Sequence, residues 1–157
     1  MRKAVFRLAS LDGASLKQAK LPEANFGEAD LRGADLRGCS AVGAFFGGAK
    51  LMRAKLTDGD FTDADLHVSD LSATDLRGAK FVGADLSRVF LYNADLRGAD
   101  FTHARLTSAR MNGSVADSDT RFPFSDEIAE RMGARFIGPK PGELRDVDDD
   151  ETQRLGK

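Results

Sequence analysis

The sequence has little of what secreted and membrane proteins usually contain. Its single cysteine, Cys39, rules out a disulfide within the chain, which favours a cytoplasmic location. No apolar run approaches the roughly 18 residues that a transmembrane helix needs. The first residues, Met1 to Phe6, enter the repeat described below at once and leave no room for a signal peptide. We therefore expect a cytoplasmic protein without membrane contact.

The residues that carry most enzyme chemistry are equally scarce. There are only two histidines, His67 and His103, and neither lies in a spacing typical of a zinc site or a nucleophile triad. The glycines recur with the repeat instead of forming a phosphate-binding loop. The acidic stretch Asp58–Asp65 lacks the spacing of a calcium loop. We predict a protein that is not an enzyme and that has no cofactor and no metal.

Charge of one sign is also lacking over most of the chain. The formal net charge is −2, and residues 1–115 carry 16 Lys and Arg against 14 Asp and Glu. Residues 116–157 carry 7 against 11, so the acidic excess lies at the C-terminal end. A chain so nearly balanced is not expected to bind nucleic acid directly or to be drawn to an anionic membrane.

The dominant positive feature is a large apolar residue at every fifth position from Phe6 to Met111, with Ala41 as the one small exception. A small residue, usually Ala, precedes each of them by two places. In an α-helix, residues five positions apart point in different directions around the axis, so this pattern gives no apolar face. In a β-strand, residues five positions apart point to opposite faces, so neither element buries the pattern. A chain that turns one corner per five residues does bury it, and four corners close a coil of 20 residues.

Phenylalanine supports the 20-residue coil independently, because the central phenylalanines fall on only two of four faces and would stack ring above ring. The expected core comprises Phe6, Phe26, Phe46, Phe61, Phe81, Phe101, Leu31, Leu36, Leu71, Leu76 and Leu96.

The units Ala34–Gly38, Ala84–Arg88 and Ala94–Gly98 resemble the A-(D/N)-L-x-x repeat of pentapeptide-repeat proteins. The resemblance covers about 70% of the chain. It implies an all-β solenoid, a right-handed quadrilateral β-helix of about 5.5 coils of four pentapeptides, spanning residues 1–113.

The character of the sequence changes after residue 113. We expect residues 114–137 to cap the last coil, because an open solenoid end exposes a sheet edge. This segment includes a short helix at about 126–132 that begins after Ser125. The alternative is that an end of the solenoid forms the interface of a homodimer. Residues 138–157 are acidic and predicted to be disordered. The capping side chains are expected to be Phe122, Phe124, Ile128, Met132 and Phe136.

Two groups of outward residues are candidate protein contacts. Asp58, Asp60, Asp63 and Asp65 form part of an acidic belt around one coil. Phe90 and Tyr92 flank Leu91 on one face, with Met52 two coils below, and an exposed aromatic pair is typical of a contact site. The C-terminal segment folding back over that pair is the alternative interpretation.

These features predict a non-catalytic protein-binding scaffold with a protein partner of unknown identity. The family resemblance implies an alternative: some members mimic B-form DNA, bind the type II topoisomerases DNA gyrase or topoisomerase IV, and protect gyrase from quinolones or toxins. A mimic should show a continuous acidic stripe along the rod, whereas this solenoid is slightly basic. A secreted or host-directed effector scaffold is a third hypothesis.

Overall fold

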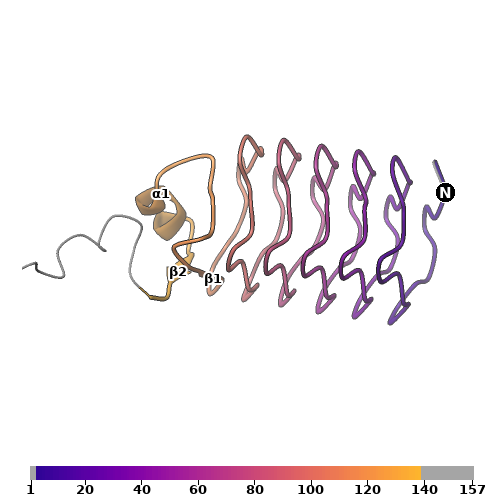
Figure 1. The fold of residues 1–157 in the computed structure, drawn as a ribbon, viewed down its shortest axis with the longest axis horizontal. Coiled ribbons are helices and arrows are strands. Elements are labelled where there is room, and N and C mark those ends of the chain that lie inside the picture. Colours follow the sequence, from indigo (N-terminus) through magenta and orange to yellow (C-terminus); the bar gives the residue numbers. More distant parts are fainter. Residues whose placement is uncertain (1–2, 139–157) are drawn as a thin grey trace, which may run out of the picture.

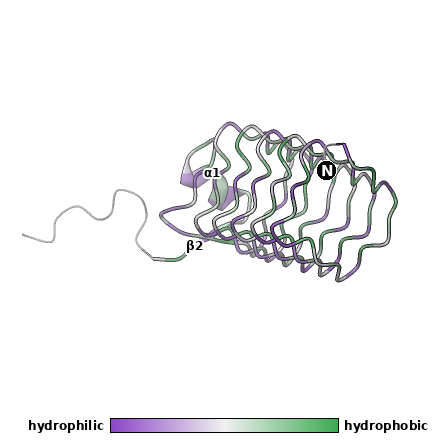
Figure 2. Cartoon of the chain, turned by 45° about the vertical axis from the view of Figure 1, so that its right-hand side comes forward, coloured by the Kyte–Doolittle hydropathy of each residue, from purple (hydrophilic) through white to green (hydrophobic). Residues whose placement is uncertain are grey.

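The structure, a computed structural model, describes residues 3–138, and the predicted disordered tail lies outside these residues except for Gly138. The chain winds into a stack of similar coils that form a rod, with the N-terminal coil at one end and helix α1 at the other (Figure 1). From Val5 to Arg110, each five-residue unit contains a two-residue turn and one residue in a β-bridge. A coil therefore has four short straight sides and four corners, and hydrophobic and hydrophilic residues alternate along it (Figure 2).

Parallel pairing at a fixed separation of 20 residues joins each coil to the next. Val5 pairs with Asn25, Asn25 with Phe45, and the same step recurs on the other three faces. The amide of Asn25 donates to the carbonyl of Ala4 at 2.8 Å, in the coil before it. The amide of Phe26 donates to the carbonyl of Phe45 at 2.7 Å, in the coil after it. The backbone polar groups of an inner coil are thus satisfied by both neighbours, as an irregular buried chain requires.

The central residues fill the inside of the rod. All of the predicted core residues except Phe6 are fully buried. Phe6 and Phe26 stack with ring centroids 4.8 Å apart, and Phe61 stacks on Phe81 at 5.2 Å. The predicted aromatic stacks are therefore present. Phe6 is only partly buried because no coil covers the first one within the described residues.

Residues at the corners have positive φ, whether or not they are glycine. Within residues 3–138, fourteen non-glycine residues adopt this left-handed conformation, among them Val68 at φ 58°. Asn and Asp tolerate it, but a β-branched side chain does not sit there without strain. The stacked ladder of hydrogen bonds on both sides of each corner holds such residues in place.

The ladder continues beyond residue 113, where the sequence pattern lapses. Asp95 pairs with Val115, and Asp100 pairs with Arg121 after one inserted residue. Strand β1 (Val115–Ala116) then pairs in parallel with strand β2 (Arg135–Phe136). Between them lies helix α1 (Asp126–Arg131), which replaces one side of this last coil. The C-terminal segment is thus a modified coil stacked on the repeat.

Four of the predicted capping side chains, Phe122, Phe124, Met132 and Phe136, pack against the core. Phe122 extends the aromatic stack, 5.6 Å from Phe101. The prediction was wrong for Ile128, which is 43% exposed. Helix α1 directs the neighbouring Ala129 inward, and adjacent helical residues point about 100° apart. Ser125 is the N-cap residue, but its side chain makes no capping hydrogen bond.

No helix within residues 3–138 is long and apolar enough to cross a membrane.

Candidate protein-binding surface

The coil separates the two candidate contact groups. The four faces are named in chain order by their central residues, the first by Phe26, the second by Leu31, the third by Leu36 and the fourth by Phe61. Phe90 and Tyr92 lie on the second face. Asp60 lies on the fourth face and Asp65 on the first, while Asp58 and Asp63 lie at the two corners of the fourth face. A partner that binds one group along the rod axis does not contact the other.

Asp60 and Asp65 of the belt accept hydrogen bonds from their own turns. Oδ1 of Asp60 accepts from the amide and the hydroxyl of Thr62, at 3.1 and 2.7 Å. Oδ1 of Asp65 accepts from the amide of His67 at 3.0 Å. The same bond recurs at other repeats, for example from Ser72 to Asp70. These carboxylates stabilise the turn, which is a sufficient reason for Asp at this position of the repeat.

Asp58 and Asp63 occupy corners, at φ 57° and 55°. Each carboxylate lies against a glycine corner of the next coil, Gly78 and Gly83 respectively, so closely that a Cβ on either glycine would meet Oδ1. Asp58 and Asp63 therefore each pack against the backbone of a glycine in the next coil.

Charge alternates along the fourth face. The bridged column there reads Lys20, Ser40, Asp60, Lys80, Asp100 and Arg121. The belt is thus confined to one level of the rod, and this column does not supply the axial acidic stripe that a duplex mimic needs.

Phe45, a third outward aromatic residue, has a packing role on the first face. Its ring lies over Gly27 and Gly47, where an added Cβ would clash with it. It also contacts the imidazole of His67, with centroids 5.9 Å apart. The Phe45 ring therefore covers the backbone of these two glycines.

Phe90 and Tyr92 lie together on the second face and are both half-buried. Their ring centroids are 5.9 Å apart with planes inclined by 26°. Arg110, in the next coil, places its guanidinium carbon 6.0 Å from the Phe90 centroid, and its Nη1 donates to Oη of Tyr92 at 3.4 Å. An arginine held against two rings is the composition typical of interface hot spots.

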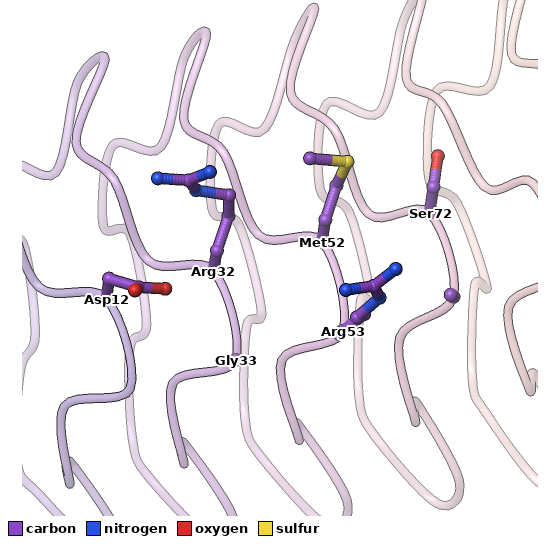
Figure 3. A pocket seen from close by; sticks show the side chains of 7 residues that line it. Asp12, Arg32, Gly33, Met52, Arg53 and Ser72 are labelled. Atoms are coloured by element: carbon purple, nitrogen blue, oxygen red, sulfur yellow. The ribbon is translucent and has the colours of Figure 1, made fainter.

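A hollow of 510 Å³ continues the same face toward the N-terminal end. Asp12, Arg32, Met52 and Ser72 lie on successive coils there, and Arg53 projects beside Met52 (Figure 3). The guanidinium of Arg32 forms a forked pair with Asp30, at 2.7 and 2.6 Å. Arg53 makes no side-chain hydrogen bond or ion pair with any described residue.

A second hollow of 370 Å³ lies at the border of the first and second faces. Val68, Arg88, Phe90, Ser108 and Arg110 line it. The Arg88 side chain, like that of Arg53, has no partner among residues 3–138. Val68 is 44% exposed at its left-handed corner, so an apolar side chain faces solvent in a strained conformation.

These residues form one surface, which we call the second-face strip. It carries five cations, Arg32, Lys50, Arg53, Arg88 and Arg110, against three carboxylates, Asp12, Asp30 and Asp70. Sequence reasoning found Phe90, Tyr92 and Met52 but not the arginines, because their positions around the hollows depend on the 20-residue stacking. The strip comprises Arg32, Lys50, Met52, Arg53, Ser72, Ala73, Arg88, Phe90, Tyr92 and Arg110.

The stacking also places a serine near a histidine, which sequence reasoning missed. Nδ1 of His67 lies 2.7 Å from Oδ1 of Asp65, and Ser87 lines the same hollow in the next coil. Ser87 donates its backbone amide to Oδ1 of Asp85 at 2.9 Å, the same turn bond as at other repeats, and no hydrogen bond joins its hydroxyl to the imidazole of His67 within residues 3–138. The pair therefore lacks the nucleophile–base contact of a triad. Among residues 3–138, no group of three His, Cys, Asp or Glu could hold a metal ion.

A rod of stacked four-sided coils with parallel pairing defines the class of β-helical repeat proteins. Residues 1–27, 29–67 and 69–107 match the family described as pentapeptide repeats (8 copies). The chain therefore belongs to the pentapeptide-repeat family.

Solved structures of this family resemble the rod. HetL, a pentapeptide repeat protein involved in heterocyst differentiation regulation from the cyanobacterium Nostoc sp. strain PCC 7120, is 29% identical with a TM-score of 0.66. The match covers 75% of this chain and 62% of HetL, so the chain spans less than two thirds of that protein. Rfr23 from the cyanobacterium Cyanothece 51142 is 26% identical with a TM-score of 0.71, over 72% of this chain and 90% of Rfr23.

A more distant structure is QnrB1, a plasmid-mediated fluoroquinolone resistance protein, at 20% identity and a TM-score of 0.54. The match covers 87% of this chain and 79% of that one, and at this identity the likeness concerns the fold alone. No curated protein matches the sequence.

Proposed function

We propose that the protein is a non-catalytic scaffold that binds a partner protein along the second-face strip. The partner segment is extended, acidic and interspersed with apolar side chains. The observation that carries this proposal is the Phe90–Tyr92–Arg110 cluster on the same face as the guanidiniums of Arg53 and Arg88, which have no hydrogen-bond or ion-pair partner among residues 3–138.

The chemistry of the strip determines the class of partner. A guanidinium binds carboxylates through paired hydrogen bonds, and it is weakly hydrated, so it suits an interface. Met52 and the two rings offer apolar area between the cations, and a thioether adapts to varied side chains. A rigid rod loses little conformational entropy on binding, which favours recognition of a flexible segment by a fixed surface.

Binding of DNA gyrase or topoisomerase IV by duplex mimicry is less well supported. Along the fourth face, Lys80 and Arg121 interrupt the acidic column. The likeness to QnrB1 concerns the fold and not the partner. The hypothesis of a secreted or host-directed effector concerns where the partner is found, and the chemistry of the strip is the same in either case.

A comparison of three full-length baits tests the proposal. The first is the unchanged chain, the second carries Arg53→Glu and Arg88→Glu, and the third carries Lys17→Glu and Lys80→Glu on other faces. We expect one partner to be retained by the first and third baits and lost from the second, with its contact in an acidic segment.

Equal retention by all three baits contradicts the proposal. Retention of gyrase that is lost with Asp63→Lys and Asp65→Lys would support duplex mimicry instead.

A further inference from the structure

The chain carries a segment with the composition that the second-face strip is proposed to bind. Residues 143–151 read Glu-Leu-Arg-Asp-Val-Asp-Asp-Asp-Glu, with six carboxylates, one arginine and the apolar Leu144 and Val147. They lie beyond Gly138, the last described residue. Charge complementarity between this segment and the strip is the first of two arguments that link them.

We propose that residues 143–151 dock on the second-face strip of the same molecule and occupy it until a partner displaces them. This inference rests on the proposed function and names the regulation of that site. The carboxylates of the segment neutralise Arg53 and Arg88, which have no side-chain partner among residues 3–138. Leu144 and Val147 cover Tyr92 and Met52.

The second argument is reach. The described chain ends just after β2, whose residues pair with β1 on the third face, which adjoins the second. Seven residues separate Gly138 from Asp146, and the eight Cα-to-Cα steps between the two span up to roughly 27 Å when the chain is extended. Coils repeat at about 4.8 Å, so Tyr92 lies about two coils from the C-terminal coil and Met52 about four. The acidic run therefore reaches the strip of its own molecule.

Intramolecular docking is favoured by effective concentration. A short connection holds the acidic run near the strip at roughly millimolar concentration, so weak contacts suffice to keep the strip occupied. Each ion pair alone contributes little, because the guanidiniums are exposed and screened by salt. A partner with a larger apolar contact therefore competes successfully.

The protein contains one tyrosine, Tyr92, and no tryptophan, so tyrosine emission reports on the strip alone. The test is acrylamide quenching of Tyr92 in two full-length chains at low salt. One is unchanged, and the other carries Asp→Asn at 146, 148, 149 and 150 together with Glu151→Gln. The quenching constant should rise by about twofold in the variant, and in the unchanged chain at about 0.5 M salt.

The matched control neutralises bases that flank the segment, with Lys140→Gln, Arg154→Gln and Lys157→Gln, and should leave the quenching constant no higher than in the unchanged chain. A second pair of chains tests the strip directly. Arg53→Glu with Arg88→Glu should raise the constant, and adding Asp149→Lys with Asp150→Lys should restore protection.

Equal quenching of the unchanged chain and the acid-neutralised variant overturns the proposal. Protection that grows with protein concentration also overturns it, because the segment would then bind a second copy. Neither result bears on the proposed function, since retention of a partner by the three baits is measured without Tyr92 emission.

Discussion

The guanidinium carbon of Arg110 lies 6.0 Å from the centroid of the Phe90 ring in the preceding coil. The two residues are also paired in the parallel ladder, so the backbone fixes their separation. A cation placed over a ring by the fold, and not by an adaptable loop, forms a preorganised contact surface.

Removing this contact should affect binding more than folding. We expect Phe90→Ala to change the unfolding free energy by about 1 kcal/mol or less, because the ring is half-buried on the surface. The same change should weaken partner binding by about 2 kcal/mol, roughly 30-fold, if Phe90 is a hot spot. Denaturant unfolding and titration of the retained partner measure the two effects. A Phe90→Ala variant that unfolds at lower denaturant concentration but binds the partner normally would show that Phe90 stabilises the fold and does not contribute to binding.

The protein should be less stable with Val68 at its corner than with glycine at the same position. Its φ of 58° is costly for a β-branched side chain, by roughly 1–2 kcal/mol, while glycine adds back some unfolded-state entropy. We expect Val68→Gly to raise the melting temperature by a few degrees. Gly43→Val is the reverse control and should lower the melting temperature, because Gly43 has φ 64° and a Cβ there would make only an ordinary contact, 3.8 Å from Cγ of Glu23. A fall in melting temperature for Val68→Gly, or a rise for Gly43→Val, would contradict the argument from strain.

The core leucines should dominate stability. Leu71 is fully buried, so Leu71→Ala should cost about 2–5 kcal/mol, and Leu71→Asp or Leu76→Lys should prevent folding by burying an unpaired charge. Arg77→Ala, which removes an exposed ion pair with Asp75, should cost less than about 1 kcal/mol. Circular dichroism melts distinguish these outcomes, and an intact Leu71→Asp rod would contradict the coil.

Acid should destabilise the third face. Hydrogen bonds from Arg37, Arg77 and Arg97 hold the pKa values of Asp35, Asp75 and Asp95 below their usual range. A lowered folded-state pKa contributes stability above the unfolded pKa of about 3.9, and that stability is lost as the pH falls through the folded-state values. Melting temperatures at pH 7 and pH 3 should therefore differ less in the triple Asp→Asn variant than in the unchanged chain.

Cys39 should be unreactive in the folded protein. It is buried in a small-residue slot, and burial raises its pKa to about 12. A thiol-specific reagent at pH 8 should modify Cys39 only after denaturation, because the thiolate is the reactive form. Rapid modification of the native chain would show that the coil opens at this level.

The coil and its core follow from the sequence because one constraint, the burial of a residue at every fifth position, recurs without interruption up to Met111. The C-terminal coil was harder to predict, since Ala116 replaces the large central residue and a helix replaces one side. The 20-residue step from Ala116 to Phe136 is the signal that would have extended the ladder.

The surface was predictable only in part. The pair of Phe90 and Tyr92 is visible from the sequence because aromatic residues are rare outside the core. The positions of Arg53 and Arg88 beside the two hollows are not visible in the sequence, because each hollow is formed by residues from three or four coils. Asp60 and Asp65 showed the opposite problem, since their number suggests a site while their hydrogen bonds belong to the turns.

The most direct test of the scaffold places a photo-crosslinking phenylalanine derivative at position 52, in the second-face strip, or at position 62, on the fourth face. After irradiation in the presence of a cell lysate, the attached peptides are identified by mass spectrometry. The account predicts that position 52 captures acidic segments of one partner while position 62 does not. Capture of the same partner from position 62, with none from position 52, would contradict it.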